Sequence, residues 1–131
     1  MSPAIVTSGL AKHYGDTRAL DGVDLMVEEG SIFGFLGPNG AGKTTMLRML
    51  TGLSRPTSGT VQVLGHDVAS TGGASNAQLG FLPDVPGFYE WMTGAEFLRF
   101  AGTLFGLERD VLETRVAMLL DLAGLAGVPT R

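Results

Sequence analysis

Cysteine is absent from the 131 residues, and lysine occurs only at Lys12 and Lys43. Without cysteine the chain can form no disulfide and no thiolate metal site, which is compatible with a reducing compartment. Positive charge is also scarce, since the formal net charge is −4 and the basic residues are scattered along the chain. A nucleic-acid or anionic-lipid surface needs clustered positive charge. We therefore expect no nucleic-acid partner.

Long apolar runs are missing as well. No stretch approaches the roughly 20 apolar residues that a transmembrane helix needs. The first residues, Met1 to Ala4, include no basic residue and precede no long apolar segment, so we expect no signal peptide. A chain of 131 residues holds one domain at most, large enough for a core but small for a nucleotide-hydrolysing enzyme.

The most specific feature of the sequence is a glycine-rich stretch that fits G-x-x-x-x-G-K-[ST] at every fixed position. It reads Gly37-Pro38-Asn39-Gly40-Ala41-Gly42-Lys43-Thr44-Thr45. Glycines let successive backbone N–H groups turn toward an anion, and the following helix directs its positive dipole end to the same place. Lys43 is then expected on the β- and γ-phosphates, and the Thr44 hydroxyl on Mg²⁺. A glycine-rich turn before an ordinary helix is the alternative.

The flanks of this stretch favour the phosphate site. Residues 31–36 include Ile32, Phe33, Phe35 and Leu36, a short apolar run typical of a buried strand. After the loop, one helical face is expected from Met46, Met49, Leu50 and Leu53, which fall at i, i+3, i+4 and i+7. The sequence therefore predicts strand, loop and helix in that order.

The rest of the first 82 residues is rich in strand and turn signals. Residues 5–14 and 18–27 predict two pairing strands around the turn Gly15-Asp16, and residues 60–64 predict a third strand. A further turn is expected at residues 65–67, and a mobile surface loop at residues 70–75. Residues 79–82 form a second short apolar run that Pro83 ends.

The last third predicts two helices that form a hairpin. Thr93 and Glu96 have the spacing of a capping box, and Met92 and Phe97 that of a hydrophobic staple. Gly106 is expected to end this helix. Asp110 and Glu113 predict a second cap, before a helix that Gly124 ends. Its expected apolar stripe is Leu112, Val116, Leu119, Leu120 and Ala123.

Four motifs in this order resemble the nucleotide-binding domain of ABC transporters over nearly the whole chain. They are L-x-K-x-Y-G at 10–15, A-L-x-x-V at 19–23, G-P-N-G-A-G-K-T-T at 37–45 and G-x-x-x-P-x-x-G-x-V at 52–61. Residues 80–84 and 88–93 are also similar to ATP subunits of drug and polysaccharide exporters. The resemblance implies an incomplete α/β P-loop NTPase fold, with a β-rich subdomain, the P-loop strand and helix, and a helical hairpin.

The resemblance also implies a division of the chain and two further site residues. Residues 1–82 correspond to part of the nucleotide-binding core, 83–92 to the Q-loop segment and 93–124 to the helical hairpin. Tyr14 falls where the family stacks an aromatic ring on adenine, whereas residue type alone favours a core tyrosine, because buried tyrosine is common. Asp84 falls where the family usually has glutamine, so it is either a metal ligand or a turn carboxylate after proline.

ATP and Mg²⁺ are the ligands that the resemblance implies, and ATP hydrolysis driving export is the activity. The implied partners are a transmembrane permease subunit, reached through residues 83–92 and the helical hairpin, and a second nucleotide-binding domain that dimerises on ATP. The implied location is cytoplasmic, on the cytoplasmic face of the membrane. Phe88, Tyr89 and Trp91 fit either a partner-facing surface or a local core over the helix that begins after Thr93.

Parts of the family pattern are missing. The sequence contains no apolar strand that ends in Asp-Glu, no serine-glycine signature and no histidine beyond them. The lookalike at residues 117–121 lies inside the apolar stripe of the second helix, so we reject it. We expect the N-terminal part of a longer domain, able to bind ATP without efficient hydrolysis. Alternatives are a non-hydrolysing nucleotide-binding module and a soluble ABC-type ATPase of translation or DNA repair. We expect His13 and His66 to be surface histidines.

Overall fold

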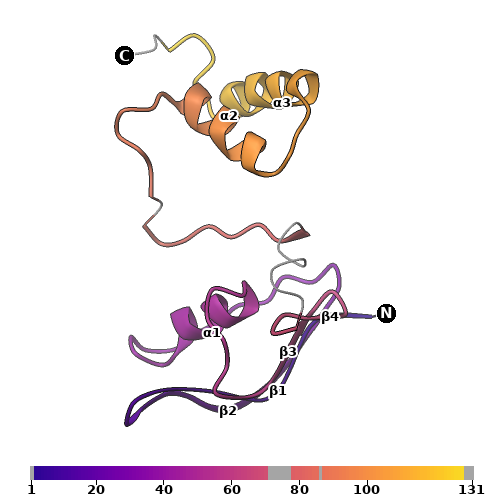
Figure 1. The fold of residues 1–131 in the computed structure, drawn as a ribbon, viewed down its shortest axis with the longest axis vertical. Coiled ribbons are helices and arrows are strands. Elements are labelled where there is room, and N and C mark those ends of the chain that lie inside the picture. Colours follow the sequence, from indigo (N-terminus) through magenta and orange to yellow (C-terminus); the bar gives the residue numbers. More distant parts are fainter. Residues whose placement is uncertain (1, 71–77, 86, 129–131) are drawn as a thin grey trace. The chain divides into compact units, whose positions relative to one another are not determined.

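The structure is a computed structural model that describes residues 2–70, 78–85 and 87–128. It divides into two compact units, Met1–Phe81 and Leu82–Arg131 (Figure 1). The mobile loop expected at residues 70–75 lies outside the described residues, apart from Ser70.

The first unit is built on an antiparallel sheet of four described strands in the order β2-β1-β3-β4. Strands β1 (Pro3–Tyr14) and β2 (Thr17–Glu28) pair over their whole length. They meet at the two-residue turn Gly15-Asp16, across which Tyr14 pairs with Thr17. Gly15 has a φ of 57°, the left-handed conformation that a tight hairpin turn requires. The predicted pair of strands is confirmed.

The other two strands form a second hairpin. Strand β3 (Ser58–Val63) pairs with β1 on one side and with the short β4 (His66–Asp67) on the other. The turn lies at Leu64 and Gly65, whose φ values are 50° and 77°, the two positive values of a type I′ turn. The turn expected at residues 65–67 is confirmed at Gly65 but begins one residue earlier, and His66 and Asp67 already belong to the returning strand.

Helix α1 (Lys43–Leu50) packs on one face of this sheet (Figure 1). It buries Met46, Met49 and Leu50, as the predicted apolar face requires. The buried cluster is completed by Leu10, Leu20, Val61, Val63 and Val68. Leu53 was placed wrongly on this face, since the helix ends at Leu50 and the Leu53 side chain is 67% exposed.

Residues 31–36 do not form the expected strand. They pair with no described segment, and Ile32 and Leu36 are almost fully exposed. A strand exists only where a neighbouring strand accepts and donates its backbone hydrogen bonds. The same holds for the apolar run at 79–82, where Leu82 is 82% exposed. Both runs have strand composition, but the described residues offer neither a partner.

The second unit is the predicted helical hairpin, α2 (Gly94–Leu104) and α3 (Arg109–Leu122). The capping box at the start of α2 is confirmed. The Glu96 N–H donates to the Thr93 hydroxyl (3.2 Å), and the Thr93 N–H donates to the Glu96 carboxylate (2.8 Å). Gly106, with a φ of 70°, follows the end of α2 as predicted.

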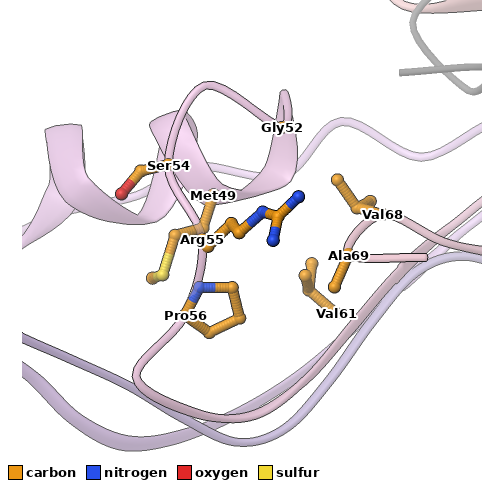
Figure 2. Close-up of a pocket in the computed structure, with 8 residues that line it drawn as sticks. All are labelled: Met49, Gly52, Ser54, Arg55, Pro56, Val61, Val68 and Ala69. Carbon is orange, nitrogen blue, oxygen red and sulfur yellow. The ribbon is translucent and has the colours of Figure 1, made fainter. Parts of the chain in front are cut away.

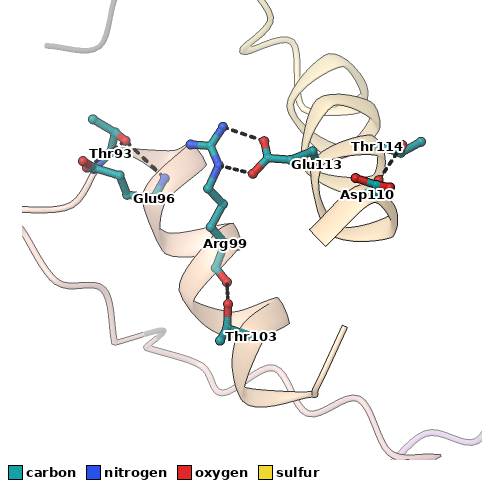
Figure 3. Close-up of polar contacts among 7 residues, drawn as sticks. All are labelled: Thr93, Glu96, Arg99, Thr103, Asp110, Glu113 and Thr114. Atoms are coloured by element: carbon teal, nitrogen blue, oxygen red, sulfur yellow. Dashed lines mark hydrogen bonds and ion pairs between the residues drawn. The ribbon is translucent and has the colours of Figure 1, made fainter. Parts of the chain in front are cut away.

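Helix α3 begins differently from the prediction. Its N-cap is Glu108 without a side-chain cap bond, while Asp110 lies in the first turn. The Glu113 carboxylate instead accepts two hydrogen bonds from the Arg99 guanidinium of α2, at 2.8 and 2.9 Å (Figure 3). Glu113 thus pairs with Arg99 on the neighbouring helix and does not take part in a cap at the start of α3.

The two helices are in close contact at Gly102 of α2, because a Cβ there would overlap the Leu112 side chain of α3. Leu112 and Val116 are buried as the stripe requires, whereas Leu119 is 39% exposed. Residues 117–121 are helical, which confirms the rejection of a magnesium-binding strand there.

Candidate functional site

We call residues 37–45, which fit the phosphate-binding motif, the phosphate loop. It connects residues 31–36 to α1, and two of its glycines have a left-handed backbone conformation. Gly40 and Gly42 have φ values of 87° and 89°, which residues with a Cβ rarely adopt. The Ala41 N–H donates to the Pro38 carbonyl (3.2 Å), and the Met46 N–H donates to the Gly42 carbonyl (2.8 Å) to begin the helix. The loop therefore turns tightly before entering the helix.

Gly42 is the N-cap of α1, and within the described part of the chain no side chain caps this helix end. The first N–H groups of a helix have no partner inside the helix. In α2 the Thr93 side chain accepts a hydrogen bond from one of these N–H groups. At the start of α1 no side chain among the described residues does so. An uncapped helix start preceded by glycines is a site suited to an anion.

The Lys43 side chain folds back over the loop. Its ammonium donates to the Gly37 carbonyl (2.5 Å) and to the Pro38 carbonyl (2.7 Å). Both acceptors are neutral carbonyls, whereas a phosphate oxygen carries negative charge and adds a direct charge–charge attraction to the hydrogen bond. A phosphate on the loop would therefore be a stronger partner for this ammonium than the two carbonyls are.

The loop is seated against strand β2. A Cβ built on Gly42 would overlap the Ala19 carbonyl oxygen and lie 2.9 Å from the Leu20 side chain. Two features therefore require glycine at position 42: its left-handed backbone conformation and the close approach of β2. The contact places the start of α1 on the hairpin that also carries Tyr14.

Thr44 is exposed in the first turn of α1, and Thr45 is half-buried. A hydroxyl oxygen is a hard ligand of the kind that Mg²⁺ takes together with phosphate oxygens and water. The described residues contain no group of three or more His, Asp or Glu side chains that could hold a metal ion. The role of Thr44 as a metal ligand stays a prediction.

Tyr14 is the last residue of β1, and 49% of its surface is exposed. Half-exposure argues against the alternative that its ring belongs to the core. The Lys12 ammonium lies over the ring, 5.1 Å from its centroid. Asp84 is exposed and belongs to the second unit, and its role as a metal ligand stays a prediction.

An apolar groove of about 870 Å³ lies in the second unit. Its lining combines the segment before α2 with both helices: Leu82, Phe88, Tyr89, Met92, Thr93, Gly94, Phe97, Leu98, Leu119, Leu120, Leu122, Ala123 and Leu125. The sequence pointed to Phe88 and Tyr89 but not to Leu122 and Leu125. Their signal is the three-residue spacing that extends from Leu119 to Leu122, the last residue of α3, and on to Leu125 beyond the helix.

Ring contacts organise one side of this groove. Phe88 packs edge-on against Phe97 with ring centroids 5.2 Å apart, and Tyr89 packs against Trp91 at 4.7 Å and Phe100 at 5.8 Å. The side chains nevertheless stay accessible, with Phe88 65% and Trp91 66% exposed. The rings thus support each other and also present apolar surface.

A smaller cavity of about 220 Å³ lies between α1 and the sheet (Figure 2). It is lined by Met49, Gly52, Ser54, Arg55, Pro56, Val61, Val68 and Ala69.

The backbone N–H of His13 donates a hydrogen bond to the Thr57 hydroxyl (3.0 Å). His13, expected at the surface, is half-buried, and its Nε2 is buried without a hydrogen-bond partner among the described residues. His66 is exposed as expected.

A glycine-rich phosphate loop that opens a helix on a β-sheet defines a nucleotide-binding protein of the P-loop class. The sequence model of the family described as ABC transporter matches residues 20–130. The chain belongs to this family. The fold is that of an ABC-type P-loop NTPase, here with an antiparallel sheet and helices that make up part of the domain.

Curated relatives agree with the family. The chain is 44% identical to the daunorubicin/doxorubicin resistance ATP-binding protein DrrA of Streptomyces peucetius, over 98% of this chain and 39% of that protein. It is 37% identical to the bacitracin transport ATP-binding protein BcrA of Bacillus licheniformis, over 95% of this chain and 40% of that protein. The chain thus spans about two fifths of the length of these relatives.

A solved structure gives the same result for the fold. A protein described as the ATP-binding subunit of an ABC transporter superposes with a TM-score of 0.80 at 30% identity, covering 93% of this chain and 51% of that one. Among residues 2–70, 78–85 and 87–128 no helix has both the length and the apolar character needed to cross a membrane.

Proposed function

We propose that the chain binds ATP with Mg²⁺ through residues 37–45, as part of an ATP-binding subunit that powers export across a membrane. The observation that carries this proposal is the uncapped start of α1, with the Lys43 ammonium held over the loop by two neutral carbonyls. The names of the two relatives, one for daunorubicin/doxorubicin resistance and one for bacitracin transport, support a drug or antibiotic as the transported substrate.

Each residue of the loop has a role in this proposal. The backbone N–H groups at the start of α1 bind phosphate oxygens. Lys43 exchanges its bonds to the Gly37 and Pro38 carbonyls for bonds to the β- and γ-phosphates, and so acts as the catalytic cation of the loop. The Thr44 hydroxyl would hold Mg²⁺, which would neutralise phosphate charge. Asp84 is proposed as a metal ligand from the family resemblance alone.

Calorimetry of ATP binding to Lys43→Ala tests the phosphate assignment. Charge-assisted hydrogen bonds contribute about 1.5–3 kcal/mol, so ATP affinity should fall by at least about tenfold. Arg48→Ala is the matched control, because it removes an exposed cation from the last turn of the same helix. Equal ATP affinities for wild type and Lys43→Ala would refute the proposed site.

The proposed partners are a permease subunit and a second nucleotide-binding domain. The apolar groove of the second unit has the concave, aromatic-lined form that receives an amphipathic helix. We propose that a cytoplasmic helix of the permease docks there, which places the protein at the cytoplasmic face of the membrane. The second nucleotide-binding domain is proposed from the family alone.

Hydrolysis is a property that we assign to the whole protein rather than to these 131 residues. They contain no Asp-Glu strand end and no serine-glycine signature, so the chain by itself should bind ATP without efficient turnover. Phosphate release is the measurement. ATP turnover that persists in the purified chain and disappears in Lys43→Ala would show that the missing groups are not needed.

A further inference from the structure

Lys12 occupies one face of the Tyr14 ring. Its ammonium is 5.1 Å from the ring centroid, within the distance at which a cation is attracted by an aromatic face. The same ammonium donates to the Arg55 carbonyl (2.7 Å). Two independent contacts therefore hold this cation between the ring and the turn that follows α1.

The Arg55 carbonyl belongs to a turn that is itself tied to the end of β1. The Thr57 N–H donates to the Ala11 carbonyl (2.8 Å), and the Thr57 hydroxyl accepts from the His13 N–H (3.0 Å). Together with the bond from Lys12, these contacts join residues 55–57 to three consecutive residues of β1. The strand end that carries Tyr14 is thereby fixed against the segment leaving the phosphate-loop helix.

We propose that Lys12 is a positioning residue for the nucleotide base. It covers one face of Tyr14 and leaves the opposite face of the ring as the stacking surface. This inference rests on the proposed function and deepens it. An aromatic ring has two faces, and a base that stacks on the face covered by Lys12 would have to displace the ammonium that the Arg55 carbonyl helps to hold there.

Two physical effects follow from this arrangement. A cation on one face draws π-electron density toward itself, which makes the opposite face a better partner for an electron-rich purine. The bond to the Arg55 carbonyl also limits the motion of the cation, so less conformational entropy is lost when the base binds. Lys12 acts through Tyr14 in both effects, and its ammonium is already engaged away from the phosphate loop.

The test is a double-mutant cycle on ATP binding in the full-length protein, measured by calorimetry with ATP and with inorganic triphosphate. Lys12→Met removes the charge and keeps the chain length, and Lys12→Arg restores a cation. Arg18→Met is the matched control, because it removes an exposed cation from the same hairpin, opposite His13. Each Lys12 variant is also measured in a Tyr14→Ala background.

We expect Lys12→Met to weaken ATP by about two- to fivefold, the range of a cation–π contact at an exposed site. Triphosphate binding should not change, Lys12→Arg should recover ATP affinity, and Lys12→Met should have no further effect once Tyr14 is alanine. An equal loss for ATP and triphosphate, or the same loss with and without the Tyr14 ring, would overturn the inference.

The outcomes separate this inference from the proposed function. If ATP binds and depends on Lys43 while Lys12→Met has no effect, only the role of Lys12 is wrong. If the wild-type protein binds neither ATP nor triphosphate, the proposed phosphate site is wrong, and the proposed role of Lys12 is then wrong as well.

Discussion

Gly42 of the phosphate loop lies so close to Ala19 of β2 that a Cβ on the glycine would overlap the Ala19 carbonyl oxygen. Gly42 also has a φ of 89° and is the N-cap of α1. The start of the helix, where we propose that phosphate binds, is therefore held against a strand by a position that has no room for a side chain. Any added atom must move either the loop or the strand.

Gly42→Ala should consequently damage both stability and ATP binding. A left-handed backbone costs a residue with a Cβ about 1–2 kcal/mol, and the overlap with β2 adds to this cost. We expect the free energy of unfolding to fall by at least about 2 kcal/mol and ATP affinity to fall by at least about tenfold. Urea unfolding and calorimetry are the measurements.

Gly34→Ala is the control for this change, because Gly34 has an ordinary φ and no atom within 4 Å of its Cβ position. It should change stability by no more than about 0.5 kcal/mol. Similar losses in the two variants would mean that the contact between Gly42 and β2 does not decide the effect.

Tyr14→Ala should weaken ATP by about 1–3 kcal/mol, since base–aromatic stacking contributes that amount. Tyr14→Phe and Tyr14→Trp should retain affinity, because stacking uses the ring and not the hydroxyl. Inorganic triphosphate distinguishes the base from the phosphates. A loss of triphosphate binding equal to the loss of ATP binding would make the tyrosine a structural residue.

Phe88→Ala and Trp91→Ala should uncouple transport from ATP hydrolysis in the full-length protein, with ATP binding and melting temperature nearly unchanged. Both side chains are about two-thirds exposed, and buried aromatic anchors dominate docking contacts once a partner covers them. Transport and phosphate release are measured in the same membrane vesicles.

Phe105→Ala is the matched control for Phe88→Ala, because Phe105 is equally exposed but does not line the groove, whereas Phe88 does. Trp91 contacts the groove residue Tyr89 without lining the groove itself. A lower melting temperature with intact coupling would assign Phe88 and Trp91 to a local core, as their contacts with Phe97 and Tyr89 permit. The docking proposal would then be wrong.

The pair of Arg99 and Glu113 should make the helical hairpin sensitive to acid. The hydrogen bonds from Arg99 lower the pKa of Glu113 below its ordinary value. A carboxyl whose pKa is lower in the folded state stabilises the fold above its unfolded pKa, and this contribution is lost as pH falls through the folded pKa. The loss should begin below roughly pH 4.3, the ordinary value for glutamate.

Glu113→Gln isolates this effect when unfolding is followed at several pH values. The wild type should be slightly more stable near neutral pH, and the difference should shrink in acid. It should be small, since the two side chains are 46% and 47% exposed and exposed ion pairs contribute little. A difference that stays constant down to about pH 3 would contradict the assigned pair.

Local signals in the sequence were sufficient for several elements. The hairpin turn at Gly15-Asp16, the capping box of Thr93 and Glu96, and the helix end before Gly106 all formed as predicted. Each depends on residues that are neighbours along the chain, so their chemistry is complete within a few positions. The same holds for the phosphate loop, whose glycines adopt their left-handed conformation locally.

Predictions that depended on a distant partner failed or stayed incomplete. Residues 31–36 have the composition of a buried strand, but no described strand pairs with them. Glu113 was assigned to a helix cap, yet its partner Arg99 is 14 positions away on the other helix. His13 was assigned to the surface, although its Nε2 is buried.

The sequence by itself therefore determined the class of protein and predicted residues 37–45 as the phosphate site, because both depend on contiguous motifs. Only the tertiary structure decided that Gly42 rests on Ala19, that Lys12 lies over Tyr14 and is bonded to Arg55, and that the C-terminal leucines of the hairpin complete an apolar groove. Apart from Lys12 and Tyr14, which are two positions apart on β1, these contacts join residues far apart along the chain. Sequence periodicity shows which face of an element is apolar, but packing alone determines which other element meets that face.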